Sequence, residues 1–368
     1  MKKLVHVTLL GKEALPVFYP IVSFKCKIIY VLGTKESQSS YSGLKSVCEY
    51  IGCEIHFIEV DPMDIPTIMQ ACEDVHSKYP AETKFQYNIT GATKTMCIGA
   101  FIVAKKHDAD IIYTDAKTYL DMNTFKKYPF EDKLDSKLIF MIQRQKLKSY
   151  AIWDNQGEGE KVTISNKIHD FIVKYNSVYK NLSDRFRKLD YIPNEYKVNS
   201  INYSFYDGEL EITQNERTLL HVNNNISKKL LFEGRWWECL VADAMSKWSD
   251  DRFEIWNDVV FDIVDNQKYN ADKNEVDILI NIGNTFVFVE CKSGAITQNE
   301  LYKLDSVKQT YGSKKSKSVL VSFWPLKEDL KQKADDLQIS VIAPDHRFGK
   351  ILDRIPSEMN KIIERLTI

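Results

Sequence analysis

EVDILINIGNTFVFVECK, residues 275–292, decides how the C-terminal half of the chain folds. Two runs of β-branched and aromatic residues flank Gly283-Asn284, a pair typical of a two-residue β-turn. The stretch therefore predicts a β-hairpin in which Asp277 lies directly across from Glu290. The opposite face of the hairpin is predicted to be a core face. Its residues are Val276, Ile278, Ile280, Val287, Val289 and Cys291.

Two carboxylates that face each other across a hairpin lie roughly 5 Å apart and repel each other. Asp277 and Glu290 are therefore expected to bind a cation between them. A divalent cation that prefers oxygen ligands, Mg²⁺ or Mn²⁺, suits these carboxylates. Lys292 points to the same side, where it can position a water or offset charge on a phosphate. Elsewhere a bare D…ExK match usually marks a solvated strand with a Glu-Lys pair. Here the register across the turn and a preceding helix favour a catalytic site.

Length and composition predict a soluble globular protein of two or three domains. The 368 residues are 44% hydrophobic and 27% charged, with a net charge of −1. Nucleic-acid binding would therefore need a local basic patch. Arg144-Lys146-Lys148 and Lys314-Lys315-Lys317 are two candidates, although each is by default solvated surface.

The cysteines indicate a reducing, cytoplasmic environment. Seven are scattered along the chain without a C-x-x-C pair, which argues against a zinc site or a disulfide frame. The N-terminal apolar run is too short for a signal peptide, and no stretch approaches a membrane span.

Residues 1–150 are predicted to form a Rossmann-like domain, a parallel sheet with helices on both faces, because strand-like and helical runs alternate. The region 137–143 is a candidate edge strand. The other expected strands are 4–10, 27–32, 54–60, 85–89 and 110–114, and the expected helices are 14–24, 41–51, 65–77 and 94–106.

Two loops at the carboxyl ends of these strands are candidate ligand sites. One reads GTKES over residues 33–37 and the other TGATK over residues 90–94. The second places backbone N–H groups, two hydroxyls and Lys94 at a helix N-terminus, which suits a phosphate. Taken alone, a helix N-cap at Thr90 or Thr93 with a turn glycine explains it at least as well. Neither loop matches a dinucleotide-binding or P-loop fingerprint.

Residues 151–230 are expected to connect two domains, with a helix over 165–189 and a hairpin over 202–213. Residues 231–368 are expected to form the second domain. Glu238, at the border of the buried stripe of the first helix, either reaches the hairpin carboxylates or is a surface glutamate. Around the hairpin the expected elements are helix 234–248, strand 253–263, helix 298–311, strand 318–323, helix 327–337 and strand 339–342.

This α-β-β-β-α-β order resembles the restriction-endonuclease-like fold of the PD-(D/E)xK phosphodiesterases. In that resemblance Asp277, Glu290 and Lys292 match the catalytic core, with Asp277 and Glu290 as metal ligands. The G-x-W-x-E pattern ending at Glu238 matches the helix that supplies a further acidic residue. Gln309 is a weak match to a glutamine that some branches carry.

The first domain resembles the CRISPR-associated Rossmann fold, CARF, whose loop T-G-G-T-K-x-M corresponds here to TGATKTM, residues 90–96. Ala92 replaces the second glycine, and its Cβ restricts positive φ angles and close backbone approach. Together the two halves resemble the stand-alone CARF–nuclease ancillary effectors of type III CRISPR defence. The resemblance implies a homodimer that binds a cyclic oligoadenylate, first of all cyclic tetra-adenylate. The residues it places at the ring are Gly33, Thr34, Lys35, Ser37, Thr90, Gly91, Ala92, Thr93, Lys94 and Met96.

The function that this resemblance implies is a ring-activated, metal-dependent endonuclease that cuts DNA, RNA or both. One alternative is a cyclic-nucleotide-sensing regulator whose nuclease-like domain only binds nucleic acid. Another is a constitutive restriction-type enzyme whose first domain only dimerises. The intact Asp277, Glu290 and Lys292 argue against the regulator, and the two hydroxyl-rich loops argue against the constitutive enzyme.

Overall fold

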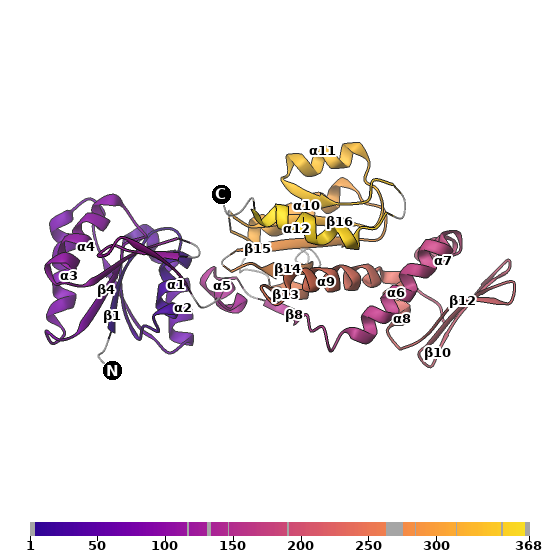
Figure 1. The fold of residues 1–368 in the computed structure, drawn as a ribbon, viewed down its shortest axis with the longest axis horizontal. Helices are drawn as coiled ribbons and strands as arrows, with labels where there is room; N and C mark the ends of the chain where they lie inside the picture. The colour runs from indigo at the N-terminus through magenta and orange to yellow at the C-terminus, as the bar shows by residue number, and fades with distance from the viewer. Residues whose placement is uncertain are drawn as a thin grey trace. The chain divides into compact units, whose positions relative to one another are not determined.

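The computed structural model describes residues 4–115, 118–130, 134–145, 147–189, 191–262, 275–283, 285–313, 315–346 and 349–364. Within these ranges the chain forms two compact units, one up to Leu147 and one that holds Lys148–Phe261 and the residues from Glu275 onward (Figure 1). No helix in the described ranges is long and apolar enough to cross a membrane. Four positions used in the sequence analysis lie outside the described residues, namely Lys146, Ile263, Asn284 and Lys314.

The first unit is built on a seven-stranded sheet of order β3-β2-β1-β4-β5-β6-β7. Its first five strands pair in parallel, which confirms the Rossmann-like sheet. An antiparallel extension, β6 and β7, follows them. The strands are β1 Leu4–Leu10, β2 Ile28–Gly33, β3 Glu54–Glu59, β4 Lys84–Asn88, β5 Asp110–Thr114, β6 Thr118–Asp121 and β7 Lys126–Pro129.

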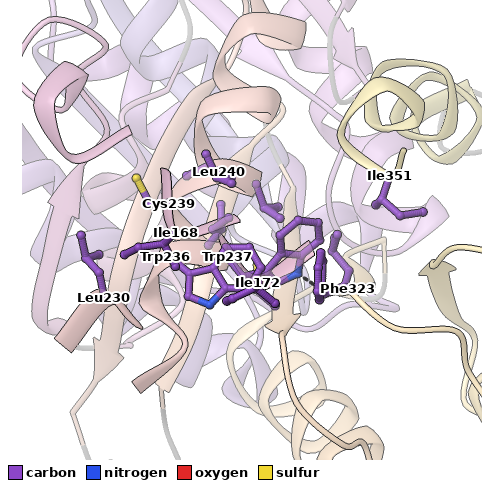
Figure 2. Close-up of a cluster of buried hydrophobic side chains, with 14 of the residues drawn as sticks. Ile168, Ile172, Leu230, Trp236, Trp237, Cys239, Leu240, Phe323 and Ile351 are labelled. Carbon is purple, nitrogen blue, oxygen red and sulfur yellow. Dashed lines mark hydrogen bonds between the residues drawn. The ribbon is translucent and has the colours of Figure 1, made fainter. Parts of the chain in front are cut away.

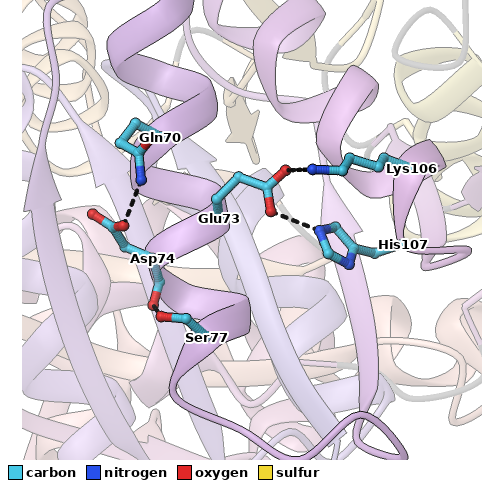
Figure 3. A network of polar contacts seen from close by, with 6 residues as sticks. All are labelled: Gln70, Glu73, Asp74, Ser77, Lys106 and His107. Carbon is cyan, nitrogen blue, oxygen red and sulfur yellow. Dashed lines mark hydrogen bonds and ion pairs between the residues drawn. The ribbon is translucent and has the colours of Figure 1, made fainter.

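The first four helices of the first unit follow the predicted order, and two of them have the predicted bounds. They are α1 Leu15–Ser23, α2 Gln38–Tyr50, α3 Ile65–Ser77, α4 Lys94–Lys106 and α5 Ser136–Ile142, with a 3₁₀ turn over Lys35–Ser37. Figure 3 shows how α3 is tied to the end of α4. The carboxylate of Glu73 lies 2.7 Å from Lys106 Nζ and 2.7 Å from His107 Nε2.

The predicted edge strand over 137–143 is wrong, because this segment forms helix α5. Asp135 caps that helix by accepting a hydrogen bond from the N–H of Lys137 at 2.7 Å. Ile139, Phe140 and Ile142 are buried at helical spacing. The apolar run KLIFMI fits either element, so the cap decides the outcome.

The second unit is built on a six-stranded mixed sheet of order β17-β16-β15-β14-β13-β8. The hairpin pairs Ile278 with Val289 and Leu279 with Phe288, the register expected from the turn. Leu279 and Phe288 are also buried, so both faces of the hairpin are core, because α9 and α10 both pack on these strands. The strands are β8 Leu147–Ile152, β13 Glu254–Phe261, β14 Glu275–Asn281, β15 Phe286–Lys292, β16 Lys317–Ser322 and β17 Ile339–Ile342.

Two tryptophans anchor α9 to this sheet (Figure 2). Trp236 and Trp237 are fully buried, and the ring N–H of Trp237 donates to the carbonyl of Val321 at 3.1 Å. Phe323 packs edge-on against both rings. The first turn of α9 is thereby fixed beside the strand ends. The helices of this part are α8 Ser227–Glu233, α9 Arg235–Ser249, α10 Gln298–Tyr311, α11 Glu328–Asp336 and α12 Ile355–Glu364, with a 3₁₀ turn over Leu352–Arg354.

Residues 151–230 belong to the second compact unit. The single helix predicted over 165–189 is wrong. It is two helices, α6 Gly159–Lys174 and α7 Asn176–Leu189, separated at Tyr175, whose φ of −125° and ψ of 43° leave the helical region. The predicted hairpin is confirmed within a four-stranded antiparallel sheet, β9 Glu195–Val198, β10 Ile201–Tyr206, β11 Glu209–Gln214 and β12 Arg217–Asn223.

Candidate active site and ligand loop

Asp277 lies where the hairpin strands stop pairing. The β14–β15 ladder begins at Ile278 and Val289, one position beyond Asp277. The side chain of Asp277 instead accepts a hydrogen bond from the N–H of Cys291 at 2.6 Å. This bond fixes one carboxylate oxygen against the main chain between Glu290 and Lys292.

Glu290 and Lys292 form an ion pair on the same side of β15, with Oε1 and Nζ 2.6 Å apart. Glu290 is 3% exposed and the side chain of Lys292 27% exposed, so this is no solvated surface pair. A paired charge this deep is stable only while its partner stays in place. The geometry therefore holds the lysine ammonium at the mouth of the site.

Burial, reinforced by repulsion between the acidic groups, is the main electrostatic property of this cluster. Burial, followed by the charges of Glu290 and Glu238, raises the pKa of Asp277 well above its ordinary value. Burial alone would lower the pKa of Lys292, but Glu290 and Asp277 outweigh it and raise that pKa. A bound cation would relieve the repulsion among these carboxylates.

Glu238 reaches the same cluster from the first turn of α9. Burial and then the charge of Asp258 raise the pKa of Glu238 to about 7, against the opposing effects of Arg235 and Lys292. We define the carboxylate cluster as Asp277, Glu290 and Glu238 together with Lys292.

Asp258 and Arg235 also belong to this site, although neither was among the predicted site residues. On β13, Asn257 pairs with Ile278 and Val259 pairs with Val276, which places Asp258 across from Asp277. Asp258 has a φ of 52°, and its Oδ1 lies 3.9 Å from Arg235 Nη1. A small cavity of about 20 Å³, enough for one water or ion, is lined by Glu238, Asp258, Asp277 and Arg235 among others. The only sequence signal was an aspartate inside an apolar strand.

The donor chemistry of the cluster suits a hard divalent cation, because carboxylate oxygens are the ligands that Mg²⁺ and Mn²⁺ prefer. The described residues contain no group of three His, Cys, Asp or Glu side chains close enough to hold a metal ion by themselves. Asp277 and Glu290 remain the two predicted ligands of such an ion. Gln309 on α10 is engaged elsewhere, since its amide donates to Asp305 Oδ1 at 3.4 Å.

In the first unit both candidate loops flank the carboxyl end of β1, because β1 lies between β2 and β4 in the parallel sheet. We call residues Thr90–Met96 the α4 loop. A Cβ on Gly91 would lie 2.3 Å from the carbonyl oxygen of Leu9, and one on Gly11 would lie 3.1 Å from Ala92 N. The α4 loop therefore packs directly on the end of β1.

Ala92 occupies the backbone conformation for which the related motif uses glycine. Its φ is 83°, in the left-handed region. A residue with a Cβ pays about 1 kcal/mol or more for that conformation. Ala92 therefore adopts the positive φ that its Cβ was expected to restrict, at a cost in backbone strain.

The hydroxyls of the α4 loop hold the loop together. Thr90 Oγ1 donates to Asn88 Oδ1 at 2.5 Å and accepts the N–H of Thr114 at 2.7 Å. Of the two candidate N-caps, Thr93 caps α4, because its Oγ1 accepts the N–H of Met96 at 3.3 Å. The Met96 side chain is fully buried, whereas Lys94 is exposed at the helix N-terminus.

The loop after β2 has the same internal construction. Thr34 N–H donates to Ser37 Oγ at 3.0 Å, and Ser37 Oγ donates back to the carbonyl of Thr34 at 2.9 Å. Gly33 is required by crowding, since a Cβ there would lie 2.5 Å from Ser37 Oγ. Ser37 is buried, and Lys35 is the exposed cation of this loop.

Comparisons with known proteins agree with this architecture. Residues 226–360 match the family model of the Card1-like endonuclease domain, and residues 4–119 match the HFX_2341_N-like N-terminal model. No curated protein sequence gives a significant match.

Three solved structures share the fold. Can2 from Sulfobacillus thermosulfidooxidans, solved in complex with cyclic tetra-adenylate, has a TM-score of 0.69 at 18% identity over 98% of this chain and 99% of its own. Protein VC1899 from Vibrio cholerae has a TM-score of 0.71 at 14% identity over 99% and 98%. A type III CRISPR defence DNA nuclease activated by cyclic oligoadenylate has a TM-score of 0.60 at 12% identity over 98% of this chain and 51% of its own.

The fold and the two matched domains define a class, a Rossmann-like, CARF-type domain joined to a restriction-endonuclease-like domain. Residues 226–360 are similar to the Card1-like endonuclease domain, and the architecture agrees with the CARF–nuclease resemblance that the sequence carries.

Proposed function

We propose that the chain is a metal-dependent endonuclease of CRISPR antiviral defence, activated by a cyclic oligoadenylate, first of all cyclic tetra-adenylate. The observation that carries the proposal is the carboxylate cluster, in which Asp277 and the Glu290–Lys292 ion pair meet at the end of one hairpin. The phosphodiester bond cut lies in DNA, RNA or both.

Each residue of the cluster has a separate task in this proposal. Asp277 and Glu290 would hold Mg²⁺ or Mn²⁺, which when bound supplies positive charge to the phosphate under attack. Lys292, kept charged by its raised pKa, orients the attacking water and offsets charge on the phosphate oxygens. Glu238, with a pKa of about 7, can take up or release a proton near neutral pH.

The α4 loop supports the sensing half of the proposal. The N-terminus of α4 directs backbone N–H groups and the exposed Lys94 toward the carboxyl ends of the strands, where an anionic ring would bind. We propose that two chains pair through their first domains in the reducing cytoplasm and bind one ring between them. The ring then favours a dimer state with competent nuclease sites.

One cleavage assay tests this function. The full-length chain with Mn²⁺ is incubated with supercoiled plasmid, single-stranded DNA and single-stranded RNA, each with and without cyclic tetra-adenylate. We expect cutting only with both the ring and the metal. Cutting without the ring would make the first domain a dimerisation module. Ring binding without cutting in any lane would favour the regulator.

A further inference from the structure

A second cavity in the second unit has a wall that directly follows Lys292 in the chain. Its volume is about 430 Å³, within the range of pockets that hold small ligands. Ser293 and Gly294, which directly follow Lys292 in the chain, form part of its wall. The N–H of Phe323 also donates to the carbonyl of Lys292 at 2.8 Å, which ties the neighbouring wall to the same strand end. The cavity therefore begins one residue from the candidate catalytic lysine.

Positive charge dominates the lining of this cavity. Lys180 and Arg187 on α7 and Lys327 after β16 face it, against a single acid, Asp184. Among the described residues none of these three cations has an ion-pair partner, and all three are exposed. Unpaired cations around a concave surface are typical of phosphate-binding sites.

An aromatic ring is held at the same place. The ring N–H of Trp324 donates to the carbonyl of Ser293 at 2.8 Å, and Phe323 packs edge-on with ring centroids 4.7 Å apart. These contacts fix the orientation of the indole. Lys180 Nζ lies 5.5 Å from the ring centroid, so a cation and the indole lie together at the wall of the cavity. A fixed ring beside exposed cations is the arrangement that single-stranded nucleic-acid sites use to stack bases.

We propose that this cavity binds an unpaired nucleotide of the substrate strand, with its base stacked on Trp324 and its phosphates beside Lys180 and Arg187. The proposal rests on the proposed nuclease function and adds a positioning site to it. A base inside a duplex is already stacked on its neighbours and cannot reach the indole, so the site favours single strands. Sugar type is not read by a ring and two cations, so DNA and RNA share this chemistry.

The test is a binding measurement that does not depend on cleavage. All variants are made in full-length chain that carries Asp277→Asn, with cyclic tetra-adenylate present. Fluorescence anisotropy follows labelled oligothymidylate, its RNA counterpart oligouridylate and a DNA duplex of equal length. Trp324→Leu should weaken binding of both single strands about tenfold, because it removes base stacking. Trp324→Phe, which also loses the bond to Ser293 but keeps a ring, should stay near the parent.

A charge-matched pair tests the phosphate contacts. Lys180→Gln/Arg187→Gln should reduce the slope of log Kd against log salt by about 1.4 for single strands. Arg185→Gln/Lys188→Gln removes two exposed cations from the same helix without touching the cavity lining, and its slope should remain that of the parent. Thermal melts confirm that each variant is folded.

The outcomes separate the two proposals. If Trp324→Leu binds single strands as the parent does, or if both double variants lower the slope equally, the nucleotide site is wrong even when the wild type cuts DNA. If the parent binds no single strand, the site is also wrong. If binding depends on Trp324 and on Lys180 with Arg187 while the wild type never cuts, the site stands and the endonuclease proposal fails.

Discussion

The α4 loop and the carboxylate cluster both lie where strands end, yet their charges are balanced in opposite ways. The hydroxyls of Thr90 and Thr93 in the α4 loop are hydrogen-bonded within the protein, and Lys94 is left in solvent. The carboxylate cluster brings acids together away from solvent, and Lys292 forms an ion pair with one of them, Glu290. A ligand of the loop has to displace only water. In the cluster, burial and mutual repulsion favour the protonated carboxyl groups, and a nearby cation would favour their ionised form.

The largest difference in effect on the two regions is expected from Asp277→Asn, which should change cleavage and leave ring binding unchanged. Loss of one of the two proposed cation ligands should lower the cleavage rate by about a thousandfold or more. The affinity for cyclic tetra-adenylate, measured by titration calorimetry, should be unchanged. Asp335→Asn, an exposed aspartate of α11, should alter neither quantity. A large fall in ring affinity for Asp277→Asn would show that the two regions are not separate.

Glu238→Gln tests how the raised pKa of Glu238 makes the stability of the carboxylate cluster depend on pH. The folded-state pKa of Glu238 is about 7, against an ordinary value of 4.5. As pH rises between these values, the unfolded chain loses its proton first, so the free energy of unfolding falls. Above about pH 7 the folded chain has lost its proton too, and the free energy of unfolding falls no further from this cause. Glutamine carries no such proton. The variant should therefore match the wild type at low pH and exceed it by up to about 3 kcal/mol at high pH.

Urea unfolding across this pH range, with a chelator present, measures the difference. Glu328→Gln is the control, because the Glu328 side chain is 87% exposed and lies outside the carboxylate cluster. A Glu238→Gln difference that shrinks as pH rises would contradict the assigned direction.

Lys94→Gln should act only on the sensing side. We expect the Kd for cyclic tetra-adenylate to rise about tenfold, because one charge-assisted contact to a phosphate is lost. Cutting at saturating ring should keep the wild-type rate. Lys105→Gln, at the other end of α4, where Lys105 Nζ donates to Asn123 Oδ1, is the control and should leave the Kd alone. Unchanged ring affinity in Lys94→Gln would remove the lysine from the proposed site.

The smallest effect is expected from Ala92→Gly. Relief of the positive φ should raise the free energy of unfolding by about 1 kcal/mol or less, since glycine also loses more chain entropy on folding. The same substitution at Ala104, buried inside α4, should have the opposite sign and cost about 1 kcal/mol. Thermal unfolding of both variants measures the pair. Destabilisation by both would mean that the α4 loop carries no relievable strain.

Local signals explain the parts of the fold that the sequence predicted. Helix α3 begins after Asp64, whose side chain accepts the N–H of Thr67, and α4 begins after Thr93. Both caps are readable as residue types. The register of the hairpin, and with it the meeting of Asp277 and Glu290, follows from turn length alone.

Non-local signals explain the parts that it did not. Asp258 joins the site only because β13 pairs with β14. The connection between these strands is too long to fix which of their residues lie opposite each other. The break at Tyr175 is hidden because apolar residues continue at helical spacing through it. Strand β8 joins the C-terminal sheet across more than a hundred residues of chain, a pairing that no local pattern marks.

The contact between Gly91 and Leu9 has a consequence for sequence drift. With 2.3 Å between a would-be Cβ and the Leu9 carbonyl oxygen, position 91 can accept no other residue while β1 stays in place. Exposed Lys94, by contrast, can be replaced without moving the main chain. Descendants of this chain that come to bind different anions should therefore differ in the exposed side chains of the loop and keep the same main-chain conformation.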